Sequence, residues 1–169
     1  MVNIDVIKDL YRHMEWADGA VWAAILATPD SINDDKIMQY LYHLHMVQRA
    51  FLRIWQGESP EAPYPEFKDA KLMMQWARTW YDEAVEQLDK FDHDKLNQPM
   101  TLPWASVVEK RIGRPPEMTS LAETAMQVAM HTTYHRGQVN ARLRELGGEP
   151  PLVDYIVWLW LGRPKAEWP

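Results

Sequence analysis

Two histidines, His131 and His135, have the spacing of a ligand pair on a helix. Residues four positions apart lie on one face of an α-helix, about one turn from each other. That face is otherwise apolar, with Leu121, Ala125, Val128, Val139, Leu143 and Leu146. We therefore expect both imidazoles to point into the core. A metal ion would satisfy two buried neutral rings, whose desolvation is otherwise costly; a hydrogen-bonded pair without metal is the alternative interpretation.

A third ligand is available from an earlier segment, which contains His43 and His45. Because they are two residues apart on a helix, they face roughly opposite directions and at most one can join the pair. The edge that continues from His43 is apolar: Val47, Ala50 and Ile54. The edge that continues from His45 is mixed: Arg49, Leu52 and Gln56. We therefore predict that His43 is the inward histidine and the third ligand.

The donor set indicates which metals and which chemistry to expect. The chain has no cysteine, so thiolate ligands, disulfides and a cysteine nucleophile are excluded. Three imidazoles suit a borderline divalent transition metal, Zn²⁺ or Ni²⁺ first and Fe²⁺ as a further choice. Three protein ligands leave coordination positions for water or substrate. The expected nucleophile is accordingly a bound water or a bound cosubstrate thiol, and the catalytic side chains themselves are unknown.

Polar residues near the expected site have two interpretations each. Asp18 lies in the middle of the first helical segment. Its carboxylate either accepts a bond from a ligand imidazole or pairs with an N–H group or an arginine unrelated to the metal. Gln138, beside the histidine face, is a candidate for the same imidazole-orienting part. We expect Arg136 to form an ion pair and Gly137 to allow close helix packing.

Four segments with helical periodicity must position these residues. They span about 4–26, 35–56, 68–90 and 120–146. Gly57 is a predicted C-cap, and Ser120 with Glu123 fits a capping box. The tail, 150–169, is expected to hold a short fifth helix. The proline-rich connection 91–118 is expected to contain a short strand or extended segment within 100–108.

These elements predict one all-α domain over residues 1–169, a four-helix bundle. The connection after the third helix is too long for a minimal link between neighbouring helices. We therefore expect a long crossover connection at that point of the chain.

Composition excludes several classes of function. The net charge of −6, from 24 acidic and 18 basic residues, disfavours nucleic acid as a partner, because duplex binding relies on many Lys and Arg contacts to phosphate. No stretch reaches the roughly 20 apolar residues of a membrane span, and the N-terminus lacks the pattern of a signal peptide. We expect a cytoplasmic protein without a membrane partner.

Two runs resemble a known family. The run HTTYHRGQVNARLRELGGEPP, residues 131–151, is similar to the signature of the DinB/YfiT-like metal-binding bundles: a histidine, three residues, His-Arg-Gly-Gln, and a Leu-bearing turn into glycine. The run YHLHMVQRAFLRIWQGESP, residues 42–60, resembles their second helix, in which a histidine precedes the closing glycine by fourteen residues. Counting back from Gly57 gives His43. Residues 16–18 and 154–155 also resemble the family, so the similarity covers essentially the whole chain.

The resemblance implies an up-down-down-up bundle, often dimeric, with a metal held by His43, His131 and His135. Many relatives carry another histidine four residues before the first ligand of the last long helix, and here that position is Gln127. We do not expect Gln127 to be a ligand, but it lies beside His131 on the helix and is a candidate for supporting the site.

Family members do not share a single function. Some resemble thiol-dependent transferases or isomerases, and others are known only as damage-inducible. The leading hypothesis is a metal-dependent enzyme with S-transferase-like activity, in which a low-molecular-weight thiol attacks a small electrophilic substrate; hydrolysis is the other reaction considered. The alternative is a metal-binding, damage- or stress-associated protein without turnover, and a homodimer is expected in both cases.

Overall fold

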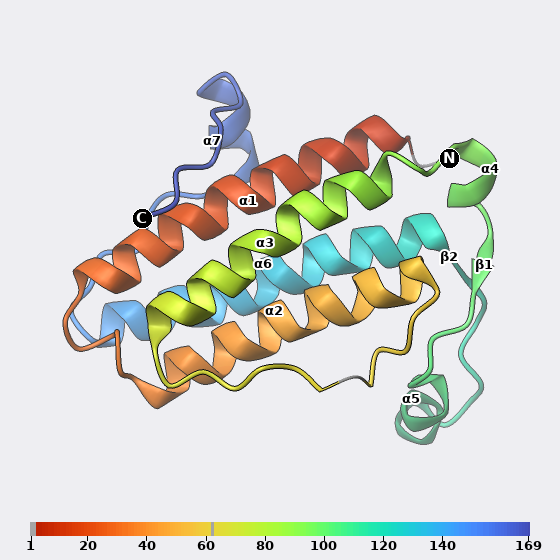
Figure 1. The fold of residues 1–169 in the computed structure, drawn as a ribbon, viewed down its shortest axis with the longest axis horizontal. Helices are drawn as coiled ribbons and strands as arrows, with labels where there is room; N and C mark the ends of the chain where they lie inside the picture. Colours follow the sequence, from red (N-terminus) through yellow and green to blue (C-terminus); the bar gives the residue numbers. More distant parts are fainter. Residues whose placement is uncertain (1–2, 62) are drawn as a thin grey trace.

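The computed structural model describes residues 3–61 and 63–169 of the chain. Its architecture is an all-α bundle of four long helices (Figure 1), which confirms the predicted fold class. The long helices are α1 Ile4–Ala27, α2 Asp35–Gln56, α3 Ala70–Leu88 and α6 Leu121–Glu145. The short elements are α4 His93–Leu96, β1 Pro99–Met100, α5 Ala105–Ile112, β2 Thr119–Ser120 and α7 Tyr155–Trp160.

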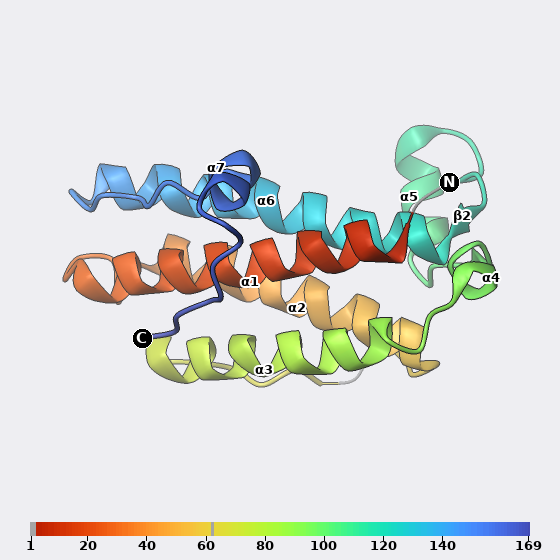
Figure 2. The same cartoon turned by 90° about the horizontal axis from the view of Figure 1, so that it is seen from above.

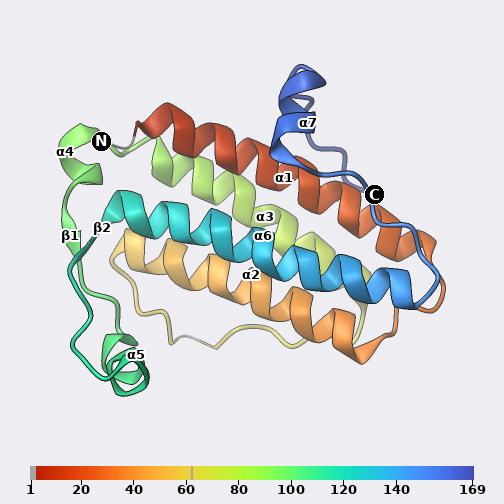
Figure 3. The same cartoon turned by 180° about the vertical axis from the view of Figure 1, so that it is seen from behind.

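The long helices run up, down, down and up, as the family resemblance implied. Figure 1 shows α2 and α3 pointing the same way, with segments 57–61 and 63–69 lying along the bundle on the way from the end of α2 to the start of α3. The crossover is thus in this connection and not after the third helix, so its predicted place was wrong. Segment 89–120 instead stays at one end of the bundle (Figures 2 and 3). The reason is that the antiparallel helix α3 ends, and α6 begins, at that end.

Local signals in the sequence explain where the helices begin and end. The Asp34 side chain caps α2 by accepting from the backbone N–H of Ile37 at 2.9 Å, and Gly57 ends α2 in the left-handed conformation at φ 80°. Ser120 and Glu123 form the predicted capping box of α6. The short strand expected within 100–108 is present at Met100, where β1 pairs with β2 over two residues, but it does not continue, since 105–112 is helical.

The core consists of two apolar clusters, one in each half of the bundle. One is built around Tyr11, Trp55 and Trp80, and the other around Trp22 and Met73. Between them lies a layer of buried polar side chains contributed by all four long helices: Asp18, His45, Gln48, Tyr81, Thr132 and Arg136. Buried polar groups stabilise a fold only when they are paired, so the bonds within this layer fix how the helices meet.

The helices α1, α2 and α6 are joined on one side of this polar layer by His45 and Gln48. The Trp22 indole N–H donates to Nε2 of His45 at 3.2 Å. Since an indole only donates, Nδ1 of His45 carries the ring hydrogen and donates to Oε1 of Gln48 at 2.9 Å. The Gln48 amide then donates to Oγ1 of Thr132 at 3.1 Å.

A buried ion pair forms the other side of the layer and joins α1, α3 and α6. A guanidinium nitrogen of Arg136 lies 2.8 Å from a carboxylate oxygen of Asp18, and both side chains are 4% exposed. The Tyr81 hydroxyl donates to the other oxygen of the same carboxylate. The guanidinium and the carboxylate are therefore both satisfied inside the bundle.

The segments outside the bundle add two features. The chain after α6 returns over α1, where the indole of Trp158 is buried and the ring of His13 contacts the carbonyl of Val153 at 2.8 Å. Within residues 3–61 and 63–169, no helix combines the length and the apolar character needed to cross a membrane.

Candidate metal centre

The packing of α2 against α6 brings His43, His131 and His135 together. One ring nitrogen from each lies within 4.8 Å of the others. The ring centroids of His131 and His135 are 4.3 Å apart, and the ring of His43 lies 5.2 Å and 4.6 Å from them. Among the described residues, no cysteine or carboxylate joins this group, so the protein offers three imidazoles.

The triad lies at the edge of the bundle and not in its centre. His131 and His135 are half-buried, and His43 is the most exposed of the three. The expectation that the pair points into the core was therefore wrong: the buried line of α6 passes through Thr132 and Arg136, each one residue further along the helix. Solvent and small molecules consequently have access to the imidazoles.

The prediction that His43, and not His45, is the inward histidine of α2 was also wrong. His45 is the inward residue, 1% exposed, and both its ring nitrogens are used within the polar layer. His43 is the histidine beside the α6 pair because the contact between α2 and α6 runs along the edge that it shares with Val47. The glycine-to-histidine spacing identified the residue that joins the group, whereas the apolar edge did not identify the buried face.

The electrostatics of the site favour the neutral form of His131 and His43, which is the form that binds metals. Burial lowers the pKa of His131 to about 4, with the neighbouring His135 and His43 as further causes. Burial, followed by the charge of His135, also lowers the pKa of His43. The rings of His131 and His43 thus favour the neutral form, because burial and the neighbouring imidazoles disfavour their protonation.

Gln138 fixes the tautomer of His135. Its Oε1 lies 2.7 Å from Nδ1 of His135, one helical turn away. Because this amide oxygen only accepts, Nδ1 carries the hydrogen and Nε2 keeps a free lone pair. An orienting hydrogen bond to the nitrogen that does not bind the metal is the usual arrangement for a histidine ligand. The residues present therefore fit a divalent metal held by three neutral imidazoles.

The other expected supporting residues lie elsewhere. Asp18 pairs with Arg136 and Tyr81 in the polar layer and accepts no bond from the triad, so the arginine interpretation is the one that holds. The ion pair expected for Arg136 is present. Gly137 is not at a close contact between helices, as had been expected, because a Cβ added there would meet no atom within 4 Å.

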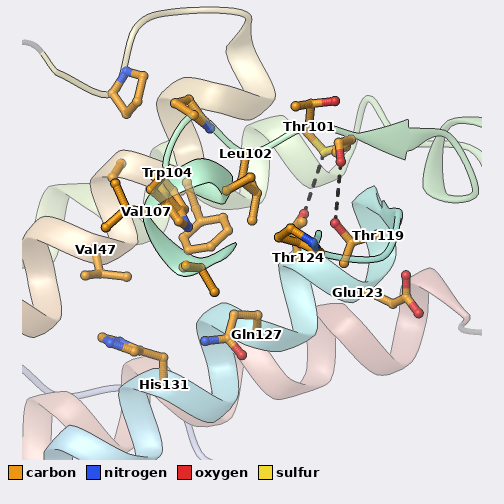
Figure 4. A pocket seen from close by; sticks show the side chains of 18 of the residues that line it. Val47, Thr101, Leu102, Trp104, Val107, Thr119, Glu123, Thr124, Gln127 and His131 are labelled. Carbon is orange, nitrogen blue, oxygen red and sulfur yellow. Dashed lines mark hydrogen bonds between the residues drawn. The ribbon is translucent and has the colours of Figure 1, made fainter. Parts of the chain in front are cut away.

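Sequence reasoning missed a large cavity next to the triad. Its volume is about 920 Å³, and it lies between the second half of α2 and the first half of α6, under segment 100–119. Figure 4 shows Trp104 from that segment beside Val47, with Gln127 and His131 lining the same cavity from α6. His131 therefore belongs both to the triad and to the cavity wall. The only signal in the sequence was the unusual length of the connection between the third and fourth long helices, because long connections often belong to functional sites.

A helical bundle in which two long helices bring three accessible histidines together defines a class of metal-site proteins. A family model described as the DinB family matches residues 1–166, so the chain belongs to the DinB family. The chain is similar to Protein DinB of Bacillus subtilis (strain 168), with 21% identity over 184 residues that cover 95% of this chain and 98% of the relative. No solved structure matches it.

Proposed function

We propose that the protein binds one divalent transition metal, Zn²⁺ or Ni²⁺ ahead of Fe²⁺, through His43, His131 and His135. The convergence of three neutral imidazoles from two helices supports this proposal, as does the tautomer that Gln138 imposes on His135. The polar layer is a further support, because the bond between Gln48 and Thr132 holds α2 and α6 in register one residue from His131.

We further propose that the protein is a metal-dependent enzyme of the thiol-transferase kind. The observation that carries this proposal is the position of His131 in the wall of a cavity of about 920 Å³. A metal next to a cavity of this size suits a reaction on a small molecule. A bound divalent metal supplies a Lewis acid, which lowers the pKa of a thiol or a water and raises its nucleophilicity at neutral pH.

The proposed reaction joins a low-molecular-weight thiol to a small electrophile. The sulfur forms a bond to an electrophilic carbon, the bond from that carbon to its leaving group breaks, and the thiol proton passes to solvent. The leaving group departs with the bonding electrons. The protein's own part is to hold the electrophile in the cavity beside His131, while the exposed side of the triad at His43 admits the thiol.

A metal-binding protein without turnover is the second candidate. One observation favours it. In the described part of the chain, the titratable side chains that line the cavity are His131 and glutamates. The carboxylate of Glu123 accepts hydrogen bonds from the backbone N–H and the hydroxyl of Ser120. Apart from these carboxylates and His131, the described lining therefore offers no general acid or base.

The experiment that separates the two candidates combines metal analysis with turnover. Protein purified without an affinity tag should contain close to one metal ion per chain. The metal-loaded protein should then accelerate the conjugation of a panel of thiols to 1-chloro-2,4-dinitrobenzene and to an epoxide, and His43→Ala should abolish that acceleration. Stoichiometric metal without acceleration for any pair would favour the protein without turnover, and the absence of metal would refute both.

We also propose that the protein is a homodimer. Large apolar side chains lie exposed on α6 and around α7, and patches of this kind mark contact surfaces. They include Met130, Tyr134, Leu152, Ile156 and Trp160. Light scattering should give twice the mass of one chain, 19.9 kDa, and a Tyr134→Glu variant should shift the protein toward the monomer. A monomer at all concentrations would contradict the proposal.

A further inference from the structure

The cavity beside the triad has walls that are mostly apolar. Aliphatic and aromatic side chains come from α2 and from segment 100–119, as Figure 4 shows for Val47, Leu102, Trp104 and Val107, whereas α6 contributes polar side chains. The Trp104 indole packs edge-on against Phe51, with ring centroids 5.2 Å apart, so one large flat surface of the wall is held in place. Its volume of about 920 Å³ falls in the range of sites for small organic molecules, roughly 300–1,000 Å³.

The charges around this cavity are all negative. Three glutamates, Glu61, Glu117 and Glu123, belong to its lining, whereas no lysine or arginine does among the described residues. The Glu123 carboxylate accepts from the backbone N–H and the hydroxyl of Ser120, which lowers its pKa and keeps it ionised. An anionic ligand would therefore lose hydration and meet like charge, without a basic side chain to compensate.

The uncharged polar side chains of the lining are those of three threonines and one glutamine, and the glutamine is the one next to the triad. Gln127 lies one turn before His131 on α6, and both belong to the lining. A glutamine side chain both donates and accepts, so it suits an uncharged polar group. The hydroxyl of Thr124, one turn earlier, already donates to the carbonyl of Leu121 and accepts from the Trp55 indole. Gln127 is thus the uncharged polar side chain that lies beside the triad and is available to orient a ligand there.

From these features we infer that the cavity binds a neutral or cationic aromatic compound, with its apolar body on Trp104 and its polar group at Gln127, and that it rejects carboxylates. The inference deepens the proposed function, because the bound compound would be the electrophile that reacts beside His131. An acidic thiol would then reach the triad only from the exposed side at His43. Trp104 and Gln127 are specificity-determining residues in this account.

Three compounds of one size test the selectivity: 4-biphenylmethanol, which is neutral, 4-biphenylmethylamine, which is a cation at neutral pH, and biphenyl-4-carboxylate. Their affinities for the full chain are measured by calorimetry, with and without a chelator. The alcohol and the amine should bind at least tenfold more tightly than the carboxylate. Equal or tighter binding of the carboxylate, or binding of none of the three, would overturn the inference.

Variants locate the binding site. Trp104→Ala should weaken binding of the alcohol at least tenfold, and Gln127→Ala should weaken it several-fold while leaving biphenyl itself unaffected. Glu117→Lys should improve carboxylate binding, whereas Glu86→Lys, an exposed change on α3, should not. Unchanged affinities in the first three variants would overturn the inference.

The two proposals fail in different measurements. Binding in the presence of a chelator reports on the cavity alone, while metal content reports on the triad alone. A protein that binds metal but none of the biphenyl compounds would refute this inference and leave the metal site intact. A metal-free protein that binds the alcohol would refute the proposed function and leave the selectivity of the cavity standing.

Discussion

The histidines of this protein differ in what satisfies their ring nitrogens. Both nitrogens of His45 are bonded to protein groups, Trp22 and Gln48, inside the polar layer. Among the described residues, the rings of His43 and His131 form no hydrogen bond to another protein group, although both are partly withdrawn from water. The first arrangement is structural, and the second leaves lone pairs available for a metal.

Substitution of the two histidines on α2 should therefore have opposite effects. His43→Ala should remove most of the bound metal and change the free energy of unfolding of the metal-free protein by no more than about 1 kcal/mol, because the side chain is partly exposed. His45→Ala should destabilise the fold by roughly 2–4 kcal/mol, since it leaves a cavity and unpaired polar groups. Elemental analysis and urea denaturation measure the two quantities. Equal metal loss in both folded variants would contradict the assignment.

Gln138 should act on the metal through His135 alone. Gln138→Ala frees the imidazole to change tautomer and to rotate, so metal affinity should fall about 10- to 100-fold. The exposed glutamine Gln75 on α3 provides a matched control. Competition with a chromogenic chelator measures both variants, and a Gln138→Ala protein with the affinity of the Gln75→Ala control would show that the hydrogen bond is unimportant.

Sequence alone was enough to name the residues of the triad, because the spacing of His131 and His135 follows from helix geometry and His43 from the family motif. Their burial could not be derived. Helix periodicity assumes that apolar positions mark the core, whereas here the buried line of α6 carries Thr132 and Arg136. Their partners, Gln48 and Asp18, lie on other helices and give no local signal.

At the scale of elements, the Asp18–Arg136 ion pair holds α1 against α6. Replacing one partner, as in Asp18→Leu, leaves a buried charge unpaired and should cost about 3–5 kcal/mol of stability. The double variant Asp18→Leu with Arg136→Met removes both charges and should cost less than the single change. Urea denaturation of the single and double variants measures the coupling. A double variant less stable than Asp18→Leu would contradict this account of the pair.

Helix ends were predictable because caps are local chemistry: Asp34, Gly57 and Ser120 act within a few residues of their own helix. The place of the crossover was not predictable in this way. Segments 57–61 and 63–69 together have fewer residues than segment 89–120, yet they run along the bundle because they contain no helix. The longer segment folds into α4, α5 and a two-residue strand pair at one end.

For the whole molecule, the buried histidines predict a stability that falls in acid. Burial lowers the pKa of His45 and His13 in the folded chain, whereas in the unfolded chain it returns to about 6.5. Below that value the unfolded chain binds more protons, so acid favours unfolding. The free energy of unfolding of the metal-free protein should be constant above about pH 7 and should fall as the pH decreases from about 6.5 toward 4.

Urea denaturation of the metal-free protein at a series of pH values checks this prediction. His45→Gln keeps a donor and an acceptor but does not titrate. Its free energy of unfolding should therefore fall less steeply than that of the unchanged protein as the pH decreases from about 6.5 to about 4. A stability that increased on acidification through this range would contradict the sign of the lowered pKa values.

The cavity belongs to the whole molecule and could not be derived from the sequence. Its wall combines residues as distant as Val47, Trp104 and His131, and it exists because segment 100–119 folds over one end of the bundle. Periodicity finds the helices beneath it but says nothing about the space between a helix and an irregular segment. The charge of the lining, in contrast, can be read directly once the residues are known.

The central claim is that three histidines hold a metal with coordination positions left open. Anomalous diffraction from a crystal of the untagged protein, recorded on both sides of the metal's absorption edge, tests it most directly. We predict one anomalous peak per chain, bounded by His43, His131 and His135, with every other protein oxygen well beyond the roughly 2.0–2.2 Å of a direct zinc ligand. A peak elsewhere, no peak after loading with zinc or nickel, or a fourth protein ligand that closes the shell would contradict the account.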